Sequence, residues 1–304
     1  MPLAALSTRL VTNSQKAFSC CAFSVMESAM SDERSRFSSR KPPFKRPSGG
    51  SRPSWGPRDV RRELNAAPGN HVLYGLHSVR EALANPRRRF LRLLATENGL
   101  ARLKETTPDL PIEPTIVRPD DIGRMLTPDA VHQGVLLEAT PPPAPALEAL
   151  PDSALLIALD QITDPHNVGA ILRSASAFGV DGVITTIRHS PEVTGVLAKA
   201  ASGGLEHVPI IGVQNLVRTL EALGERGVLR VGLDSEAEHD FASAPLRRPM
   251  VLVLGAEGKG LRQSTRAACD VLARIELPGA IRSLNVSNAA AISLYAVNQR
   301  LGAR

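Results

Sequence analysis

The sequence predicts an α/β protein whose C-terminal domain is built on a parallel β-sheet. Beyond residue 153, short apolar runs rich in Val, Ile and Leu alternate with stretches of helical character. Continuous apolar runs of this length indicate strands buried on both faces, and the intervening helices provide the crossovers that parallel strands need. A segment rich in Pro and Ala, residues 141–152, precedes this region and is typical of a semi-rigid linker.

A smaller α/β domain is expected before the linker, at residues 70–140. The segment HVLYGLHSVREALAN predicts a short strand and then a helix, with Leu76, Val79 and Leu83 on its apolar face. FLRLLAT predicts a second strand, and VHQGVLLEA predicts the strand that closes the domain.

Six apolar runs are expected to form the sheet of the C-terminal domain, residues 153–304. In chain order they are LLIALD, VDGVITT, HVPIIGV, VLRVGLD, MVLVLGA and LARIELP. In open α/β sheets, ligands bind beyond the carboxyl ends of the strands. The loops that follow these runs are therefore the expected place for functional residues.

The composition excludes several classes of protein. Hydrophobic residues make up 43% of the 304 residues and charged residues 22%, as in ordinary globular proteins. No apolar run approaches the roughly 18 residues of a membrane-spanning helix, so we expect no membrane association. The three cysteines, Cys20, Cys21 and Cys269, cannot build a disulfide framework or a four-ligand zinc site, and the histidines show no metal-ligand spacing. We therefore expect a cytoplasmic protein without a bound metal.

Residues 1–69 are expected to be a disordered basic tail. Within them, residues 31–62 carry ten basic and three acidic side chains among Ser, Pro and Gly, with too few apolar residues for a core. Flexible Lys/Arg segments bind RNA or DNA by releasing counterions, although a merely solubilising tail has the same composition. The hydrophilic SDERSRF after Met30 is typical of a protein start. We therefore expect translation to begin at Met26 or Met30, so that residues 1–25, or 1–29 for a start at Met30, are a mis-assigned start.

The loop after LLIALD continues as QITDPHNVGAILRSASAFG and begins a helix. Asn167 lies at the start of this helix, and Arg173 follows six residues later. Asp164 to Asn167 offer candidates for the helix N-cap, so Asn167 alone is explained equally well by capping, and Arg173 by an exposed surface position. Gly169 permits another backbone to approach closely.

The loop after MVLVL is LGAEGKG, residues 254–260, in which glycines surround Glu257 and Lys259. It lacks the GKS or GKT ending of a nucleotide-binding P-loop, and no GxGxxG follows the first strand. Kinase, NTPase and dinucleotide-binding functions are therefore poorly supported. A glycine-rich turn that carries a carboxylate suits close packing around a small ligand, although an exposed Glu in a tight turn is also common.

The third loop, IELPGAIRSLNVSNAA, precedes the last predicted helix. Ser283, Asn285, Ser287 and Asn288 cluster just before that helix. Polar side chains and free backbone amides at a helix start can hold a ligand, and the same residues are also good helix caps.

The three motifs, in this order, resemble the TrmH branch of the SPOUT superfamily, RNA methyltransferases that methylate ribose 2′-hydroxyls with S-adenosylmethionine. The matching residues are NxGAIxRSAxAFG, LGAEGKGL and IELPGAIRSLNVSNAA, and the match covers about residues 153–304. YGLHSVREAL and HQGV, which open and close the first domain, resemble the substrate-binding domain of the subgroup that methylates guanosine in bacterial 23S rRNA. The resemblance favours rRNA over tRNA as the substrate.

The resemblance also implies roles for individual residues and an assembly. Arg173 would be the catalytic residue, and its companions in the active site would be Asn167, Glu257, Ser283 and Asn285. S-adenosylmethionine would be bound largely by backbone groups at Gly255, Ile275 and Leu284. Members of this family form a deep trefoil knot from these loops and act as homodimers through it.

Two alternatives to rRNA methylation remain open. A tRNA ribose methyltransferase would share the fold and mechanism, and it would differ only in the RNA that accepts the methyl group. A non-catalytic ribosome-assembly factor is disfavoured because Asn167, Arg173, Glu257 and Asn285 are all present. Arginine is a poor general base because its pKa exceeds about 12. We therefore expect Arg173 to hold the target phosphate and hydroxyl, and to act as a base only if the closed site favours its neutral form.

Overall fold

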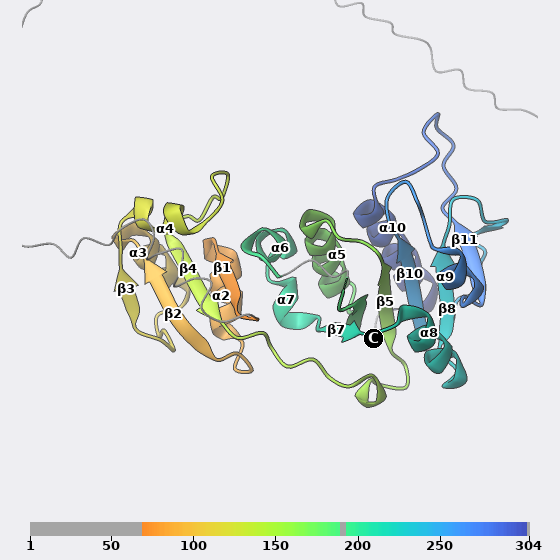
Figure 1. The fold of residues 1–304 in the computed structure, drawn as a ribbon, viewed down its shortest axis with the longest axis horizontal. Helices are drawn as coiled ribbons and strands as arrows, with labels where there is room; N and C mark the ends of the chain where they lie inside the picture. The colour runs from red at the N-terminus through yellow and green to blue at the C-terminus, as the bar shows by residue number, and fades with distance from the viewer. Residues whose placement is uncertain (1–68, 189–192, 303–304) are drawn as a thin grey trace, which may run out of the picture. The chain divides into compact units, whose positions relative to one another are not determined.

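The computed structural model describes residues 69–188 and 193–302, which form two β-sheets (Figure 1). Almost the whole predicted basic tail, together with the expected initiators Met26 and Met30, lies outside the described residues. The predicted linker lies between the two sheets in sequence, and it contains one short 3-10 turn, η1 (Leu147–Ala149).

The first sheet has four strands in the order β1-β4-β2-β3. β4 pairs antiparallel with β1 and with β2, and β2 pairs parallel with β3. The strands are β1 (His71–Tyr74), β2 (Phe90–Ala95), β3 (Pro114–Ile116) and β4 (Val135–Ala139), and the helices are α2 (Leu76–Ala84), α3 (Glu97–Thr106) and α4 (Pro119–Met125). The predicted opening strand and helix and both further strands are present. We call residues 71–139 the small-sheet unit.

The second sheet has seven strands in the order β7-β6-β5-β10-β8-β11-β9, and all neighbours are parallel. The strands are β5 (Leu155–Asp160), β6 (Gly182–Thr186), β7 (Ile210–Val213), β8 (Leu229–Leu233), β9 (His239–Asp240), β10 (Met250–Gly255) and β11 (Val271–Arg274). The helices are α5 (Pro165–Ala177), α6 (Gly195–Ala201), α7 (Gly204–His207), α8 (Leu216–Glu225), α9 (Gln263–Ala267) and α10 (Val286–Leu301). Each of the six predicted apolar runs overlaps one strand, which confirms the predicted parallel α/β sheet. We call residues 155–301 the large-sheet unit.

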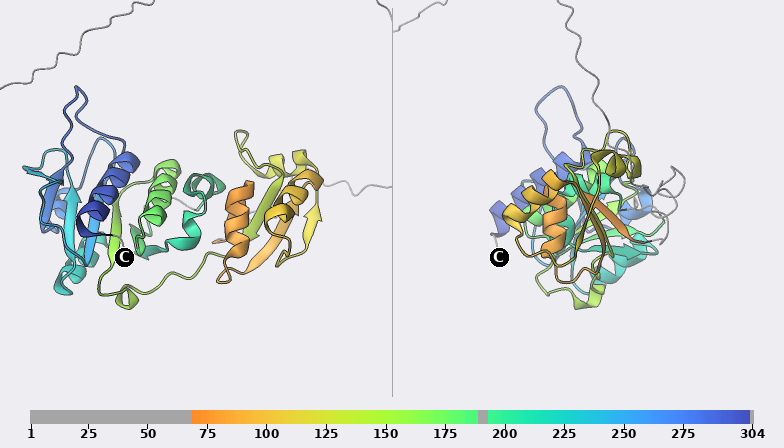
Figure 2. Two further views of the ribbon diagram at one scale, coloured as in Figure 1. Left: turned by 180° about the vertical axis from the view of Figure 1, so that it is seen from behind. Right: turned by 90° about the vertical axis from the view of Figure 1, so that its left-hand side faces the viewer.

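Helices cover both faces of this second sheet (Figure 1 and Figure 2). On one face, Leu155, Ile157 and Leu159 of β5 belong to the same core cluster as buried residues of α5 and α10. On the other face, Leu156 and Ala158 belong to a cluster with buried residues of α8. A strand covered on both faces has apolar residues at successive positions rather than at alternate ones, as β5 has. None of the described helices is long and apolar enough to cross a membrane.

Two helices position three of the predicted site residues: α5 carries Asn167 and Arg173, and Asn285 is the N-cap of α10. The two helices contact each other on one face of the sheet. α5 begins with Asp164, whose side chain accepts a hydrogen bond from the His166 N–H group, and Pro165 occupies the first helical position. α10 begins after Asn285, whose side-chain oxygen accepts hydrogen bonds from the Ser287 N–H and hydroxyl groups. These caps fix both helix starts at the carboxyl edge of the sheet.

Candidate active site

Three side chains from the three predicted motifs meet at the carboxyl edge of the large sheet. The Asn167 Nδ2 group donates to Glu257 Oε1 across 3.0 Å, and Asn285 Nδ2 donates to the same oxygen across 2.5 Å. Asn285 Nδ2 also donates to Asn167 Oδ1 across 3.0 Å. One carboxylate oxygen therefore accepts two amide hydrogen bonds, which is a strong arrangement because the acceptor is charged.

Helix capping is an alternative explanation for both Asn167 and Asn285, and the structure gives a different answer for each. Asp164 caps α5, so the interpretation of Asn167 as a helix cap is wrong. Asn167 is buried inside the first turn of α5 and its side chain bonds to Glu257 instead. Asn285 both caps α10 with its side-chain oxygen and donates to Glu257 with its side-chain nitrogen. A single amide can do both because its oxygen accepts while its NH₂ group donates.

Arg173 lies on the same helix as Asn167 and its side chain is exposed. Within the described residues, the Arg173 side chain forms no hydrogen bond or ion pair. Its guanidinium is therefore not neutralised by a neighbouring carboxylate in the described part of the protein. An exposed guanidinium has five N–H donors in a fixed plane, a geometry that matches phosphate oxygens.

The other predicted site residues line the loops without joining this cluster through a hydrogen bond. Ser283 is exposed and Leu284 is half-buried in the loop before α10. Ile275 is half-buried directly after β11, and Gly255 ends β10 next to Asp160 in the strand register. The structure thus brings Asn167, Glu257 and Asn285 into contact, and it leaves the others near the same strand ends.

Sequence reasoning missed an ion pair between a buried carboxylate and a half-exposed arginine that anchors the Glu257 loop. Asp160, the last residue of β5, has a side chain that is 0% exposed. Its carboxylate accepts hydrogen bonds from the Arg262 backbone N–H across 3.0 Å and from Arg262 Nε across 2.7 Å. The signal was an acidic residue at the end of an apolar run. The partner could be identified only once β5 and β10 were known to be neighbours.

The loop between these anchors closes on itself. Ala256 and Gly260 form a β-bridge, and the Gly260 N–H group donates to the Ala256 carbonyl across 2.8 Å. A Cβ atom at Gly255 would overlap the backbone of Gly260, so a glycine is required there by close packing. Because both ends of the loop are fixed, Glu257 within it is held where the two asparagines reach it.

The neighbouring loop offers free backbone groups to a ligand. Among the described residues, the N–H and C=O groups of residues 277–284 form no hydrogen bond with another backbone group. Unpaired backbone polar groups beside the half-buried Ile275 and Leu284 could bind a molecule with both polar and apolar parts. The described residues contain no cluster of three His, Cys, Asp or Glu side chains that could hold a metal ion.

Comparison with known proteins defines the class to which this fold and site belong. Residues 154–295 match the sequence model of the SpoU rRNA methylase family. Residues 72–145 match the model described as RNA 2′-O ribose methyltransferase substrate binding. The two matches cover both sheets, and they place the protein among the RNA methyltransferases.

Individual relatives agree with this assignment over most of their length. A protein of Photorhabdus laumondii named 23S rRNA (guanosine-2′-O-)-methyltransferase RlmB is 36% identical over 249 residues, which are 76% of this chain and 99% of that protein. The protein of the same name from Vibrio cholerae is 37% identical over 253 residues, 77% of this chain and 99% of that protein. The chain belongs to the SpoU rRNA methylase family, which confirms the resemblance inferred from the three motifs.

A solved structure shows the same fold. The SpoU methyltransferase AviRb from Streptomyces viridochromogenes, in complex with the cofactor AdoMet, superposes with a TM-score of 0.68 at 25% sequence identity. The superposition covers 82% of this chain and 97% of that chain. The small-sheet and large-sheet units thus both have counterparts in a methyltransferase of this family.

Proposed function

We propose that the protein transfers the methyl group of S-adenosylmethionine to the 2′-hydroxyl of a guanosine in 23S rRNA. The observation that carries this proposal is the cluster of Asn167, Glu257 and Asn285, in which Asn167 lies on the same helix as Arg173. The names of the bacterial relatives support the choice of RNA and nucleoside, because this chain spans almost their whole length.

The cofactor would be held by the loops at the carboxyl ends of β10 and β11. Gly255, Ile275 and Leu284 would contact it, and the free backbone groups of residues 277–284 fit the polar edges of an adenosine. S-adenosylmethionine supplies a methyl group that is already activated by its sulfonium. Positioning of the ribose is then the main task of the protein, and it can contribute about 7 to 11 kcal/mol to lowering the barrier.

Arg173 would hold the nucleotide that accepts the methyl group. Its exposed guanidinium can bind a phosphate oxygen and the 2′-hydroxyl together, which places that oxygen for attack on the methyl carbon. A bond forms between oxygen and carbon as the carbon–sulfur bond breaks, and the hydroxyl proton must leave. Arg173 would act as the base only where the closed site favours its neutral form, because its ordinary pKa exceeds about 12. The active site around Arg173 would be shaped by Asn167, Glu257, Ser283 and Asn285.

The same proposal includes a homodimer, a trefoil knot and a location. Ile292 and Tyr295 of α10 are 45% and 56% exposed, and the rings of Tyr295 and Phe178 form a T-shaped pair at a centroid distance of 6.5 Å. Exposed apolar side chains that gather on one helix face favour a protein interface. The loops of residues 254–260 and 275–285 would form the knot. The protein would act in the cytoplasm because its proposed RNA substrate is there.

Identification of the methylated nucleoside tests the proposal directly. The full chain is incubated with labelled S-adenosylmethionine and, separately, with unmodified 23S rRNA and tRNA transcripts, and each RNA is then digested to nucleosides. Label recovered as 2′-O-methylguanosine from rRNA is the expected result. Label in tRNA alone would replace the proposed substrate and keep the reaction. Cofactor binding without transfer to either RNA would contradict the proposed substrate, and absence of cofactor binding would contradict the reaction itself.

A further inference from the structure

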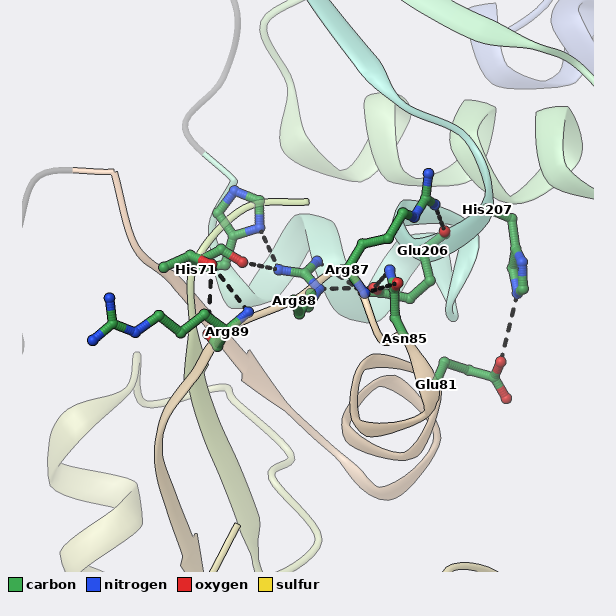
Figure 3. Close-up of polar contacts among 9 residues, drawn as sticks. His71, Glu81, Asn85, Arg87, Arg88, Arg89, Glu206 and His207 are labelled. Carbon is green, nitrogen blue, oxygen red and sulfur yellow. Dashed lines mark hydrogen bonds and ion pairs between the residues drawn. The ribbon is translucent and has the colours of Figure 1, made fainter. Parts of the chain in front are cut away.

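A buried ion pair joins the small-sheet unit to the large-sheet unit (Figure 3). Arg88 follows α2 in the small-sheet unit, and Glu206 lies on α7 of the large-sheet unit. Arg88 Nε donates to Glu206 Oε2 across 2.7 Å, and its terminal nitrogen donates to Oε1 across 2.8 Å. The pair is therefore bidentate, which fixes the angle between the two side chains as well as their distance.

Water is excluded from this pair, and other groups complete its hydrogen bonds. The Arg88 and Glu206 side chains are 0% and 4% exposed. Asn85 Nδ2 donates to Glu206 Oε2 across 2.8 Å. The other terminal nitrogen of Arg88 donates to the Thr140 carbonyl across 2.8 Å and to His71 Nδ1 across 3.2 Å. Arg88 thus ties the ends of β1 and β4 to a carboxylate of the other unit.

Apolar side chains beside the ion pair also pack the small-sheet unit against the large-sheet unit. The core cluster that contains Leu73 and Val79 of the small-sheet unit continues through Leu197 of α6. The Tyr74 ring lies directly against Gly195, where a Cβ atom would overlap it. Apolar contact is non-directional, whereas a bidentate ion pair has one favourable orientation. The ion pair therefore adds a directional restraint to the apolar contact between the units.

The segment that carries Glu206 rests on the helix that carries Arg173. A Cβ atom at Gly204, the first residue of α7, would lie 2.7 Å from the Leu172 carbonyl oxygen and 3.2 Å from the Arg173 nitrogen. A Cβ atom at Gly169 of α5 would lie 2.6 Å from the Leu197 carbonyl oxygen of α6. Contacts this close join α5, α6 and α7 backbone to backbone. Arg88 therefore contacts Glu206 of α7, and the first residue of α7 in turn packs against the backbone of Arg173.

We propose that Arg88 and Glu206 are positioning residues that orient the small-sheet unit relative to Arg173 and so determine which nucleotide of a bound RNA reaches the active site. The part that concerns RNA rests on the function proposed above. The two residues do not touch the reacting atoms. Loss of the pair would leave the cofactor site intact and allow the small-sheet unit to hold RNA at more than one angle to Arg173.

Three variants of the full chain test this role. Glu206→Gln keeps the shape of the side chain and removes the charge, and Arg88→Met keeps the length and removes both charge and donors. Arg89→Met is the matched control, because it removes the same charge from the next residue, whose exposed side chain points away from Glu206 (Figure 3). Cofactor binding by calorimetry, expected unchanged in all three, shows whether each variant is folded.

The first measurement is a distance distribution, which does not depend on the reaction. Spin labels are carried by non-natural residues at positions 102 and 218, which are exposed on α3 and α8. We expect one narrow distance in the wild type and in Arg89→Met, and a broader distribution in Glu206→Gln and Arg88→Met. Unchanged narrow distances in the last two variants would overturn the proposal whether or not the protein methylates rRNA.

The second measurement is single-turnover methylation at saturating 23S rRNA, with every methylated position mapped. Glu206→Gln and Arg88→Met are expected to lower the rate at least tenfold and to spread methyl groups to additional nucleotides, whereas Arg89→Met is expected only to weaken RNA binding. A wild-type rate and a single site in Glu206→Gln would overturn the positioning role. A wild type that methylates neither rRNA nor tRNA would overturn the proposed function, and the label distances would still decide whether the pair orients the units.

Discussion

Asn285 lies 118 residues after Asn167 in the chain, and its side-chain nitrogen donates a hydrogen bond to the Asn167 oxygen across 3.0 Å. Both amides also donate to the same oxygen of Glu257. The three side chains are contributed by α5, by the loop after β10 and by the start of α10. The site therefore exists only when the whole large sheet is assembled, and each of the three residues restrains the other two.

Glu257→Gln tests whether the carboxylate is needed to hold this cluster. The glutamine side chain has the same size but carries no charge, so its hydrogen bonds with the two asparagine amides are weaker. We expect single-turnover methyl transfer to fall about 10- to 100-fold, with little change in thermal unfolding, because Glu257 is exposed. Glu276→Gln, which removes an exposed carboxylate from the next loop, is the control. Equal rates in the two variants would contradict the role of Glu257.

Arg173 is tested with two substitutions that separate charge from shape. Arg173→Ala is expected to lose at least about 100-fold in transfer rate while binding the cofactor nearly normally. Arg173→Lys keeps the charge and loses the planar set of donors, so its rate should also fall. Arg218→Ala, an exposed arginine on α8, controls for the loss of one positive charge. A wild-type single-turnover rate in Arg173→Lys would show that the planar guanidinium has no part in the reaction.

The Asp160–Arg262 pair predicts an asymmetric effect on stability. Arg262→Ala removes the guanidinium, so the fully buried Asp160 carboxylate loses its positive partner and the hydrogen bond from Arg262 Nε. Removing one partner of a buried charge costs about 3 to 5 kcal/mol. Asp160→Asn leaves Arg262, whose side chain is 42% exposed, free to be hydrated, so we expect a cost of about 2 kcal/mol. Urea unfolding of both variants measures the difference. A larger loss of unfolding free energy for Asp160→Asn than for Arg262→Ala would contradict the idea that the unpaired buried carboxylate is the main cost.

His71 makes the stability of the protein depend on pH. Burial, together with the nearby Arg88 charge, lowers the pKa of His71 from 6.5 to about 4. The unfolded chain therefore binds a proton more readily than the folded one, and the contribution of His71 is complete above about pH 6.5 and is lost as the pH falls toward 4. A tenfold change in proton affinity corresponds to about 1.4 kcal/mol, so this loss amounts to up to about 3 kcal/mol.

His71→Asn removes the titrating group and keeps an acceptor for Arg88. The free energy of unfolding of this variant should decrease less steeply than that of the wild type between pH 6.5 and pH 4. Denaturant unfolding at several pH values makes the comparison. Parallel curves for the two proteins would mean that another group is responsible for the pH dependence in this range.

The sheet and the cluster of site residues could be predicted for the same reason. The central strands β5 and β10 are nearly continuous apolar runs, and the other main strands are mostly apolar. The carboxyl ends of parallel strands share one edge, so the loops that follow the runs must converge. Asn167, Glu257 and Asn285 each follow such a run. The two-residue strand β9 could not be predicted, because two residues carry no periodic pattern.

The two long-range ion pairs could not be predicted from the sequence. Arg88 and Glu206 are 118 residues apart. Arg88 is the middle one of three consecutive arginines, and nothing in the sequence GGLEHVP marks Glu206 as its partner. Asp160 and Arg262 are 102 residues apart and meet only because β10 lies beside β5. Pairing of this kind depends on the tertiary structure, whereas an apolar pattern reports only local burial.

The position of β10 between β5 and β8 has a consequence for synthesis of the protein. A chain that has left the ribosome only as far as residue 245 already contains β5 and β8 but not the strand that belongs between them. The free edge of β5 is then an unpaired apolar strand, the kind of surface that leads nascent chains to aggregate. Productive folding of the large sheet must therefore wait for β10 to emerge, and molecular chaperones would find their main target in this interval.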